Sequence, residues 1–259
     1  MKAKTIFRVL LMIICIICNH EDTTANSLSL DLQIVPDSSY HDGNEHGRDE
    51  AIPSLFRECK HRIREMHPSW NITLWNEESG LQYLKNELSE YVQAYTSFTY
   101  NVQRADFLRL ALVYGMGGFY MDLDMYPLQA LDNLLEKSLV LAEEMTVSEK
   151  TQKSLNLKYR NRIANYMFGG EAGHPFLRRM MDAMAERSTI KVSSQQEILD
   201  VTGPGLLTDT YWDNTATYPD ITLLRNEGWY VELPDGRKET CLFGKYAVHL
   251  HAGTWRKEI

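Results

Sequence analysis

The sequence predicts one α/β domain with a mostly parallel central sheet and helices on both of its faces. Two observations support this prediction. The chain has 259 residues, of which 44% are hydrophobic, and Gly and Pro are ordinary in number, so it can bury a core and is not disordered, collagen-like or low in complexity. Apolar runs of strand length alternate with amphipathic runs of helix length. Ligands of such sheets lie at the carboxyl ends of the strands.

The elements in the first half of the chain follow from periodicity and helix-end signals. Pro53 opens a helix, and Leu55, Cys59 and Ile63 share its apolar face. Glycines 115, 117 and 118 end a later helix and lead into a short buried strand. The elements predicted up to residue 142 are a strand at 28–35, a polar loop at 36–49, helices at 53–66, 77–95 and 99–115, strands at 71–75, 119–121 and 138–142, and a short helix ending at 135.

The second half continues the alternation. Residues 145–162 are polar and rich in Lys, Ser and Thr, which favours a mobile surface loop. Pro175 begins a strongly amphipathic helix. The remaining predicted elements are strands at 163–168, 221–225 and 246–251, and helices at 175–187, 195–200 and 205–212.

The N-terminal segment is typical of a targeting sequence. Lys2, Lys4 and Arg8 precede the apolar run from Val9 to Cys18. This run is shorter than the roughly 20 residues that a membrane-spanning helix needs. We expect residues 1–25 to be a signal peptide, or alternatively a short anchor associated with a membrane, and residues 26–259 to be the domain. The protein is then lumenal in the Golgi or endoplasmic reticulum, as a type II membrane protein if anchored, or secreted if cleaved.

The net charge limits which partners we expect, and the cysteine content limits the number of disulfides. Acidic residues number 35 against 27 basic ones, for a net charge of −8, so we expect no nucleic acid partner. A small or metal-chelated anion can still bind at a local site. Outside the targeting segment only Cys59 and Cys241 remain. They can form one disulfide in an oxidising lumen or stay as two buried thiols.

Two aspartates at the end of a buried strand predict a metal site. Asp122 and Asp124 follow the strand at 119–121, and residues at i and i+2 of a strand point to the same side. Paired carboxylates suit Mn²⁺ or Mg²⁺, which often takes further ligands from substrate phosphates. Asp-x-Asp alone is common in solvated turns. The apolar strand before this pair and the glycines before the strand favour the functional interpretation.

Asp106 and Arg109 lie three residues apart on the preceding helix and therefore share a face. One interpretation is a surface ion pair. The functional interpretation is that Asp106 accepts hydrogen bonds from sugar hydroxyls, and that Arg109 binds a phosphate or hydroxyl near the reacting bond.

These motifs resemble a known family. Arg104-x-Asp106-x-x-Arg109 followed by Tyr114-Gly115-x-Gly117-Gly118-x-Tyr120-x-Asp122-x-Asp124 is similar to the signature of glycosyltransferase family 32, whose sugar-binding region contains a DXD motif. The family includes α-1,6-mannosyltransferases, inositol phosphoceramide mannosyltransferases and an α-1,4-galactosyltransferase. The resemblance implies a GT-A fold and metal-dependent, α-retaining transfer of a sugar from a UDP or GDP donor to a glycan or glycolipid.

Three later segments resemble the same family in the same order. They are Asn165-Tyr166-Met167-Phe168 with Gly173-His174-Pro175, then Thr202-Gly203-Pro204, then Tyr246-Ala247-Val248-His249 with Gly253-Thr254-Trp255. The resemblance implies metal ligation by Asp122, Asp124 and His249. It implies catalytic roles for Asp106, Arg109, Asp122 and Asn165. The residues that it implies for donor binding are Arg104, Asp106, Arg109, Gly118, Tyr120, Asp122, Thr254 and Trp255.

Other interpretations remain open. A phosphatase of the haloacid dehalogenase type also has a strand ending in Asp-x-Asp, but it needs a later acidic pair that the sequence lacks. A sugar-binding protein without catalysis is a third hypothesis. A histidine in a strand, such as His249 or His251, is more often a core residue than a ligand, and without the resemblance His251 is interpreted as structural.

Overall fold

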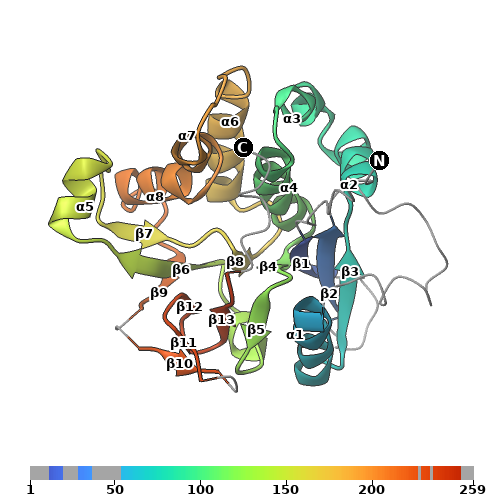
Figure 1. The fold of residues 1–259 in the computed structure, drawn as a ribbon. Coiled ribbons are helices and arrows are strands. Elements are labelled where there is room, and N and C mark those ends of the chain that lie inside the picture. The colour runs from blue at the N-terminus through green and yellow to red at the C-terminus, as the bar shows by residue number, and fades with distance from the viewer. Residues whose placement is uncertain (1–11, 20–28, 37–53, 227–228, 234–235, 252–259) are drawn as a thin grey trace, which may run out of the picture.

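The structure, a computed structural model, describes residues 12–19, 29–36, 54–226, 229–233 and 236–251. A mixed sheet runs through the middle of the molecule with helices along one face (Figure 1). Among the described residues, its strands are β1 (Met12–Asn19), β2 (Ser29–Pro36), β3 (Trp70–Leu74), β4 (Gly118–Asp122), β6 (Leu139–Thr146), β7 (Asn161–Ile163), β8 (Met167–Gly170) and β9 (Ile221–Leu224).

The α/β class is confirmed, but the sheet is mixed and not mostly parallel. Only the pairings β2–β3 and β6–β9 among those described are parallel. β4 pairs antiparallel with β1 and β8, and β6 pairs antiparallel with β7 and β8. The physical reason is connectivity. A parallel pair needs a long crossover, whereas β6, β7 and β8 follow one another with no long helix between them.

Met12–Asn19 form strand β1, which lies between β2 and β4 in the sheet. The sequence predicts instead that residues 1–25 stand outside the fold. A short unbroken apolar run fits both a targeting segment and a buried strand. Whether this segment is cleaved stays a prediction.

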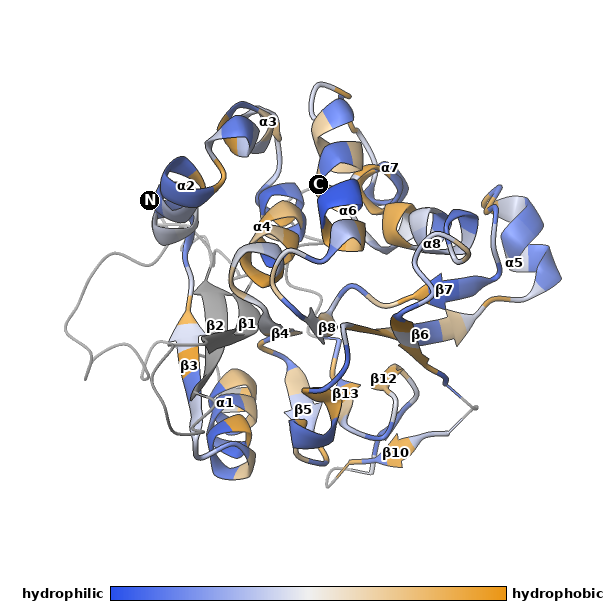
Figure 2. Ribbon diagram, turned by 180° about the vertical axis from the view of Figure 1, so that it is seen from behind, coloured by the Kyte–Doolittle hydropathy of each residue, from blue (hydrophilic) through white to orange (hydrophobic). Residues whose placement is uncertain are grey.

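Helices cover the first face of the sheet. They are α2 (Glu77–Glu87), α3 (Val92–Ser97), α4 (Asn101–Met116), α6 (Pro175–Glu186), α7 (Gln195–Val201) and α8 (Pro204–Asp213). Most residues of α4 are buried, and Figure 2 shows it largely hydrophobic, whereas α2 and α5 (Glu149–Ser154) are largely hydrophilic. A helix that is buried on most of its sides is part of the core, so α4 sits between the sheet and the outer helices.

Helix α1 (Ser54–Met66) and a small sheet cover the second face (Figure 1). The small sheet joins β12 (Leu242–Phe243), β13 (Ala247–His249) and β5 (Met125–Pro127). Beside it lies the hairpin of β10 (Val231–Glu232) and β11 (Lys238–Glu239). The sequence analysis does not predict β5, β10, β11 or β12, because two- and three-residue strands have no readable periodicity.

The side chains of β4 alternate between two hydrophobic cores, one on each face of the sheet. Tyr120 packs into the core beneath α4 and α6, whereas Phe119 and Met121 pack into the core beneath α1 and the small sheet. All three side chains are buried. Successive side chains of a strand point to opposite faces, so β4 is fixed from both sides and its last residue, Asp122, is held in place.

Four predicted elements differ in the structure. The helix predicted at 77–95 breaks at Leu88 into α2, a 3₁₀ turn at Ser89–Tyr91 and α3. The break brings Tyr91 and Tyr95 against Phe107, with ring centroids 5.4 and 6.2 Å away. The predicted loop at 145–162 contains α5 and the start of β7, and the strand predicted at 163–168 is divided between β7 and β8. The short helix predicted to end at 135 is a 3₁₀ turn, Asp132–Leu134.

Cys59 and Cys241 are both buried and free, so the second of the two predicted alternatives is the one observed. Burial raises the pKa of the Cys59 thiol well above its usual range and the pKa of Cys241 to about 12. Within the described residues, no helix has the length and apolar character needed to cross a bilayer.

Candidate active site

The Asp-x-Asp pair lies where β4 ends and turns into β5. Asp122 is the last residue of β4, Leu123 and Asp124 form the turn, and Met125 starts β5. Leu123 is fully buried in the core beneath α1, which anchors the turn and leaves the two carboxylates on its other side. The backbone N–H of Asp122 donates to the carbonyl oxygen of Tyr166 at 2.7 Å.

The last described strand brings a histidine to this turn. β13 pairs with β5 so that His249 is in register with Met125. The backbone N–H of Leu250 donates to the carbonyl oxygen of Asp124 at 3.0 Å. A residue more than 120 positions away in sequence is therefore fixed beside the turn by ladder hydrogen bonds.

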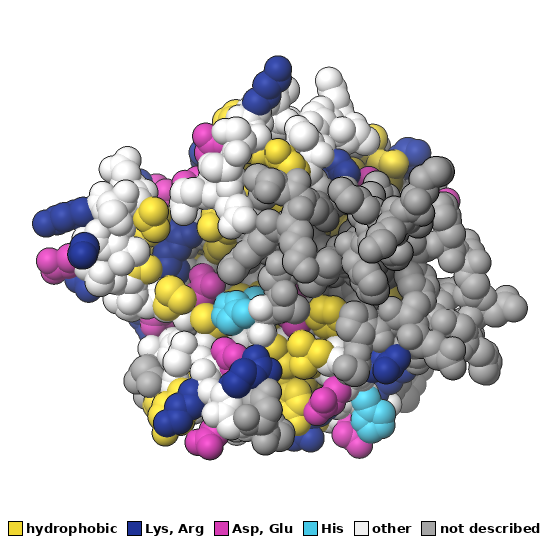
Figure 3. Space-filling view, in the orientation of Figure 1, with side chains coloured by type: hydrophobic (Ala, Val, Ile, Leu, Met, Phe, Trp, Pro, Cys, Tyr) yellow, Lys and Arg dark blue, Asp and Glu magenta, His cyan; other side chains and the backbone are white. Residues whose placement is uncertain are grey.

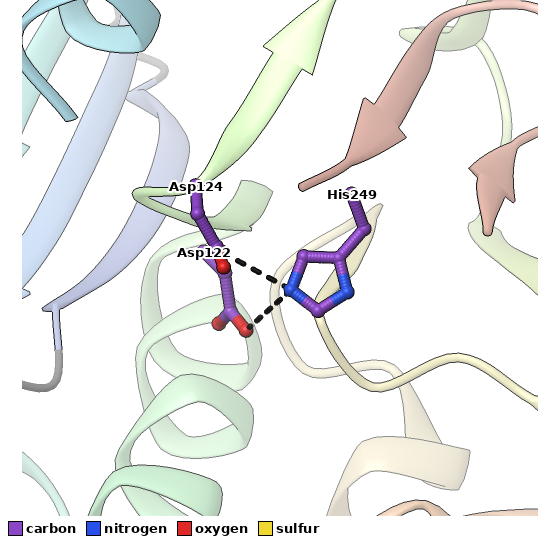
Figure 4. Close-up of side chains that lie close together, drawn as sticks. All are labelled: Asp122, Asp124 and His249. Carbon is purple, nitrogen blue, oxygen red and sulfur yellow. Dashed lines mark ion pairs between the residues drawn. The ribbon is translucent and has the colours of Figure 1, made fainter. Parts of the chain in front are cut away.

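Both carboxylates face the His249 ring (Figure 4). His249 Nε2 lies 3.1 Å from Asp124 Oδ1 and 3.9 Å from Asp122 Oδ2. One ligand atom from each residue lies within 4.8 Å of the others. Two carboxylate oxygens and one imidazole nitrogen form a donor set that suits Mn²⁺ and, with more water ligands, Mg²⁺. The residues thus fit the divalent metal that the sequence predicts.

Asp122 is constrained from several sides. The hydroxyl of Tyr120 donates to Asp122 Oδ1, and Arg109 Nη1 lies 3.5 Å from the same oxygen. Burial raises the pKa of Asp122 to about 6, and the nearby Asp124 carboxylate adds to the rise, whereas Arg109 and His249 oppose it. These contacts occupy Oδ1 and leave Oδ2 directed at His249.

His249 is held by aromatic contacts. Its ring stacks on Tyr166 at a centroid distance of 4.4 Å and lies 4.2 Å from the ring of His251. Burial works to lower the pKa of His249, but the Asp124 and Asp122 carboxylates outweigh it, and the pKa is raised. Nδ1 is buried and has no hydrogen-bond partner among the described residues, so the described polar contacts of this side chain are at Nε2.

Asp106 and Arg109 form a buried ion pair and not the surface pair considered above. Arg109 Nη2 lies 3.1 Å from Asp106 Oδ1, and their side chains are 5% and 4% exposed. Arg109 Nη1 also donates to the carbonyl oxygen of Asn165 at 2.6 Å, and the guanidinium lies 4.7 Å from the centroid of the Tyr120 ring. Burial opposes its charge, but Tyr120, Asp122 and Asp106 raise the pKa of Arg109. Arg109 therefore ties the Asp106 carboxylate to the Asp-x-Asp turn.

The Asp106 carboxylate also accepts hydrogen bonds from two neutral side chains. Asn165 Nδ2 donates to its Oδ1 at 3.0 Å, and Thr202 Oγ1 donates to its Oδ2 at 2.9 Å. Burial raises the pKa of Asp106, against the opposing effects of Arg109, Thr202 and Asn165. Buried carboxylates need such partners, and these set the orientation of the group.

The site opens into a cavity of about 300 Å³. Four predicted catalytic residues, Asp106, Arg109, Asp122 and Asn165, line it together with His249. Figure 3 shows apolar, basic, acidic and histidine side chains together on this face of the molecule. The other lining residues are Val102, Glu144, Met145, Val147, Leu155, Leu157, Arg162, Tyr166, Gln195, Gln196, Ile198, Leu199, Pro204 and His251.

Several residues predicted to bind the donor lie elsewhere. Arg104 forms an ion pair with Glu77 at 3.0 Å and donates to the carbonyl oxygen of Phe98. Gly118 begins β4 and lines a different cavity, at the far end of the strand from Asp122. Tyr120 is fully buried, and its hydroxyl donates a hydrogen bond to Asp122. Thr254 and Trp255 lie outside the described residues.

Three cavity-lining or supporting residues were not among the predicted site residues. Thr202 belongs to the Thr-Gly-Pro segment, Tyr166 follows Asn165 directly, and Arg162 precedes it by three positions. Their only sequence signal is proximity to a motif, because hydrogen bonding to Asp106 or stacking on His249 depends on tertiary packing.

Comparison with known proteins agrees with the sequence analysis. Residues 53–141 match a family model described as a glycosyltransferase sugar-binding region containing the DXD motif. This region includes α4, the Asp-x-Asp turn and the ion pair of Asp106 with Arg109. The predicted resemblance to this family is confirmed.

Several similar curated proteins are fungal mannosyltransferases. Inositol phosphoceramide mannosyltransferase 3 of Schizosaccharomyces pombe is 26% identical over 179 residues, which cover 69% of this chain and 45% of that protein. Inositol phosphoceramide mannosyltransferase 1 of the same organism is 32% identical over 35% of this chain and 30% of its own length. The initiation-specific alpha-1,6-mannosyltransferase of Candida albicans is 23% identical over 54% of this chain and 43% of its own. The chain thus spans less than half the length of these relatives.

Among solved structures, the PaToxG glycosyltransferase is similar, with a TM-score of 0.41 and 16% identity over 71% of this chain and 58% of that one.

Proposed function

Starting from the match of residues 53–141 to the DXD glycosyltransferase family, we propose that this protein is a metal-dependent glycosyltransferase of the GT-A type. It moves a sugar, with retention and α-linkage, from a UDP or GDP donor to a glycan or glycolipid acceptor. The observation that carries the proposal is the convergence of Asp122, Asp124 and His249 on the cavity that Asp106, Arg109 and Asn165 also line.

Asp122, Asp124 and His249 would hold Mn²⁺ or Mg²⁺. When bound, the ion supplies positive charge that stabilises the departing diphosphate, which accumulates negative charge in the transition state. Arg109 contributes fixed positive charge within contact of Asp122 and keeps that carboxylate oriented. Because the ion and Arg109 are positioned before the reaction, little reorganisation is needed as the bond breaks.

Asp106 and Asn165 would bind the donor sugar. The carboxylate of Asp106 accepts hydrogen bonds from sugar hydroxyls, and the Asn165 amide both donates to Asp106 and has an oxygen that can accept. The ion pair with Arg109 prevents Asp106 from rotating away from the cavity. Fixed orientation of donor and acceptor supplies a large part of the rate enhancement in two-substrate reactions.

We also propose that the domain works in the lumen of the secretory pathway. The support is the N-terminal layout of Lys2, Lys4 and Arg8 before an apolar run. An alternative to cleavage is that this segment stays with the protein, as its place in strand β1 would require.

The test is release of nucleoside diphosphate from a panel of UDP- and GDP-sugars in the presence of Mn²⁺, with the full chain. We expect turnover of one donor that stops on chelation. Asp124→Asn removes a ligand charge and should lower kcat at least about 100-fold, in line with loss of a main charge-stabilising group. The control Asp213→Asn changes an aspartate of the exposed Lys158–Asp213 pair and should keep full activity.

Release of inorganic phosphate from phosphate monoesters, with no donor turnover, would indicate the phosphatase hypothesis instead. Donor binding without any turnover would indicate a sugar-binding protein. Full activity of Asp124→Asn would contradict the proposed metal site.

A further inference from the structure

The histidine of the candidate metal site lacks the contact that usually fixes the ring of a metal ligand. A histidine that ligates a metal through one ring nitrogen almost always donates the N–H of the other to a carboxylate, a carbonyl or water, and this hydrogen bond sets the orientation of the ring. His249 directs Nε2 at Asp122 and Asp124. Its Nδ1 is buried and donates to no described residue. The orientation of the ring therefore depends on other contacts.

The carboxylates around the site do not supply the missing contact. Asp122 and Asp124 both lie at Nε2 (Figure 4). Glu144 also lines the cavity, and its charge works to raise the pKa of His249, but Nδ1 has no hydrogen bond to it. A charge acting from a distance does not select one rotation of a planar ring. The groups that touch the faces of the His249 ring must therefore set its orientation.

Two aromatic rings lie against the His249 ring. Tyr166 stacks on it with the centroids 4.4 Å apart and the planes inclined by 30°, and the His251 ring lies 4.2 Å away at 54°. Tyr166 is only 3% exposed, whereas His251 is exposed. Aromatic rings in contact prefer particular relative orientations. The buried and more nearly parallel Tyr166 ring is thus the neighbour that restricts rotation of His249.

Tyr166 is itself anchored at its side chain and at its backbone. Its hydroxyl donates to the carbonyl oxygen of Leu242 at 3.2 Å, and Leu242 is in register with Val248, the residue before His249, in the pairing of β12 with β13. Its backbone carbonyl oxygen accepts from the N–H of Asp122 at 2.7 Å. Tyr166 therefore contacts β4 through its backbone and the histidine of β13 through its ring, so it joins the two strands that carry metal ligands.

We propose that Tyr166 is a positioning residue of the metal site, and that the flat face of its ring holds the His249 imidazole with Nε2 directed at the cation. The inference rests on the proposed function, because it requires His249 to ligate the metal. A side chain that is oriented before its ligand arrives loses little rotational freedom on binding, which is the source of affinity in preorganised sites. Removing the Tyr166 ring should therefore weaken metal binding through His249.

The test is Mn²⁺ binding to the full chain without nucleotide, measured from the electron paramagnetic resonance signal of free Mn²⁺. Tyr166→Phe keeps the ring and loses the hydroxyl, and we expect its Kd to stay close to that of wild type. Tyr166→Leu removes the flat face and should raise the Kd about 10- to 100-fold, the usual effect of losing an outer contact of a metal ligand. If Tyr166→Leu does not fold, Tyr166→Met takes its place, because methionine fills irregular gaps without a flat face.

Tyr211→Leu is the matched control. Tyr211 is also a buried tyrosine, and its ring packs against Phe176 and Trp212. It is not among the residues that line the cavity of the metal ligands. The same substitution at this position should lower stability in urea but leave the Kd for Mn²⁺ unchanged, which separates loss of packing from loss of ligand orientation.

A double-mutant cycle shows whether Tyr166 acts through His249. His249→Ala removes the ligand itself, and the two aspartates should keep weaker Mn²⁺ binding measurable. Because residues in direct contact are energetically coupled, we expect Tyr166→Leu to have no further effect on the Kd in the His249→Ala background.

A folded Tyr166→Leu that binds Mn²⁺ as tightly as wild type would overturn the inference and leave the metal site in place. Equal losses in the Phe and Leu variants would assign the effect to the hydroxyl bond with Leu242 and not to the stacked ring. An undiminished loss in the His249→Ala background would show that Tyr166 acts through another group, which also contradicts the inference. If wild type binds no Mn²⁺, the proposed metal site fails, and the role of Tyr166 fails with it.

Discussion

Asp106 is positioned by partners from separate parts of the chain. It receives hydrogen bonds from Asn165, which follows β7, and from Thr202, which follows α7, and it pairs with Arg109 on its own helix. Each partner removes part of the cost of burying its charge. The local consequence is a carboxylate with one orientation, ready to accept hydrogen bonds without first reorganising.

Thr202 is expected to act through Asp106. Thr202→Val keeps the shape of the side chain but removes the donor, and hydrogen bonds to charged groups contribute about 1.5–3 kcal/mol. We expect kcat/KM for the donor to fall about 10- to 100-fold, mainly through KM, with Thr202→Ser close to wild type. The measurement is steady-state release of nucleoside diphosphate. Equal losses in the Val and Ser variants would show that packing of the methyl group, and not the hydroxyl, is what matters.

At the scale of elements, one histidine links the end of α1 to the loop that follows β5. His67 Nε2 accepts from the backbone N–H of Leu131 at 3.0 Å, so Nδ1 carries the proton and donates to the carbonyl oxygen of Ile63 at 3.0 Å. This tautomer satisfies both ring nitrogens. A second proton on Nε2 would remove the bond to Leu131.

The pH dependence of stability should report this arrangement. Burial lowers the pKa of His67 below the ordinary histidine value of about 6.5, so the unfolded chain binds the proton more readily than the folded one. The stability that neutral His67 contributes is therefore fully present above about pH 6.5. It is lost as the pH falls below this value, by up to about 1.4 kcal/mol per pH unit. We would measure urea unfolding from pH 8 to 5 for wild type and His67→Gln. An identical slope in both proteins would mean that His67 is not the responsible group.

The pairing of β4 with β8 requires a glycine opposite an aromatic ring. Gly169 is in register with Phe119, and a Cβ at 169 would overlap the Phe119 ring. Gly169→Ala should destabilise the fold by about 1–3 kcal/mol, the usual cost of overpacking. Combining it with Phe119→Leu should cost less than the sum of the two single changes, measured by chemical denaturation in a double-mutant cycle. Simple additivity would show that the ring and the new methyl do not meet.

At the scale of the whole molecule, the metal ligands connect parts of the chain that are far apart in sequence. Asp122 and Asp124 lie between β4 and β5, and His249 lies at the end of β13. A cation bound by all three would stabilise the folded state but not the unfolded one. Metal binding should therefore be visible in the stability of the entire domain.

We expect Mn²⁺ to raise the melting temperature. At a concentration 100 times its Kd, a ligand stabilises the folded state by about 2.7 kcal/mol, or on the order of 5–10 °C for a domain of this size. Asp124→Asn should abolish this increase and Asp213→Asn should retain it, as measured by calorimetry. An equal increase in both variants would show that Mn²⁺ binds elsewhere.

The sequence by itself determined the α/β class, the helix from 101 to 116 within one or two residues, and the pairing of Asp122 with Asp124 at the end of a buried strand. It could do so because apolar periodicity, glycines and strand alternation are local properties. The predicted resemblance also named Asp106, Arg109, Asn165 and His249 before any contact between them was known.

Only the tertiary structure decided how these residues meet. Strand order and direction depend on which connections cross the sheet, so the mixed sheet and the place of β1 could not be read from periodicity. Arg104 and Gly118 belong to the same motif as Asp122 but face other surroundings. Contact, burial and charge pairing are properties of residues distant along the chain, and folding alone brings them together.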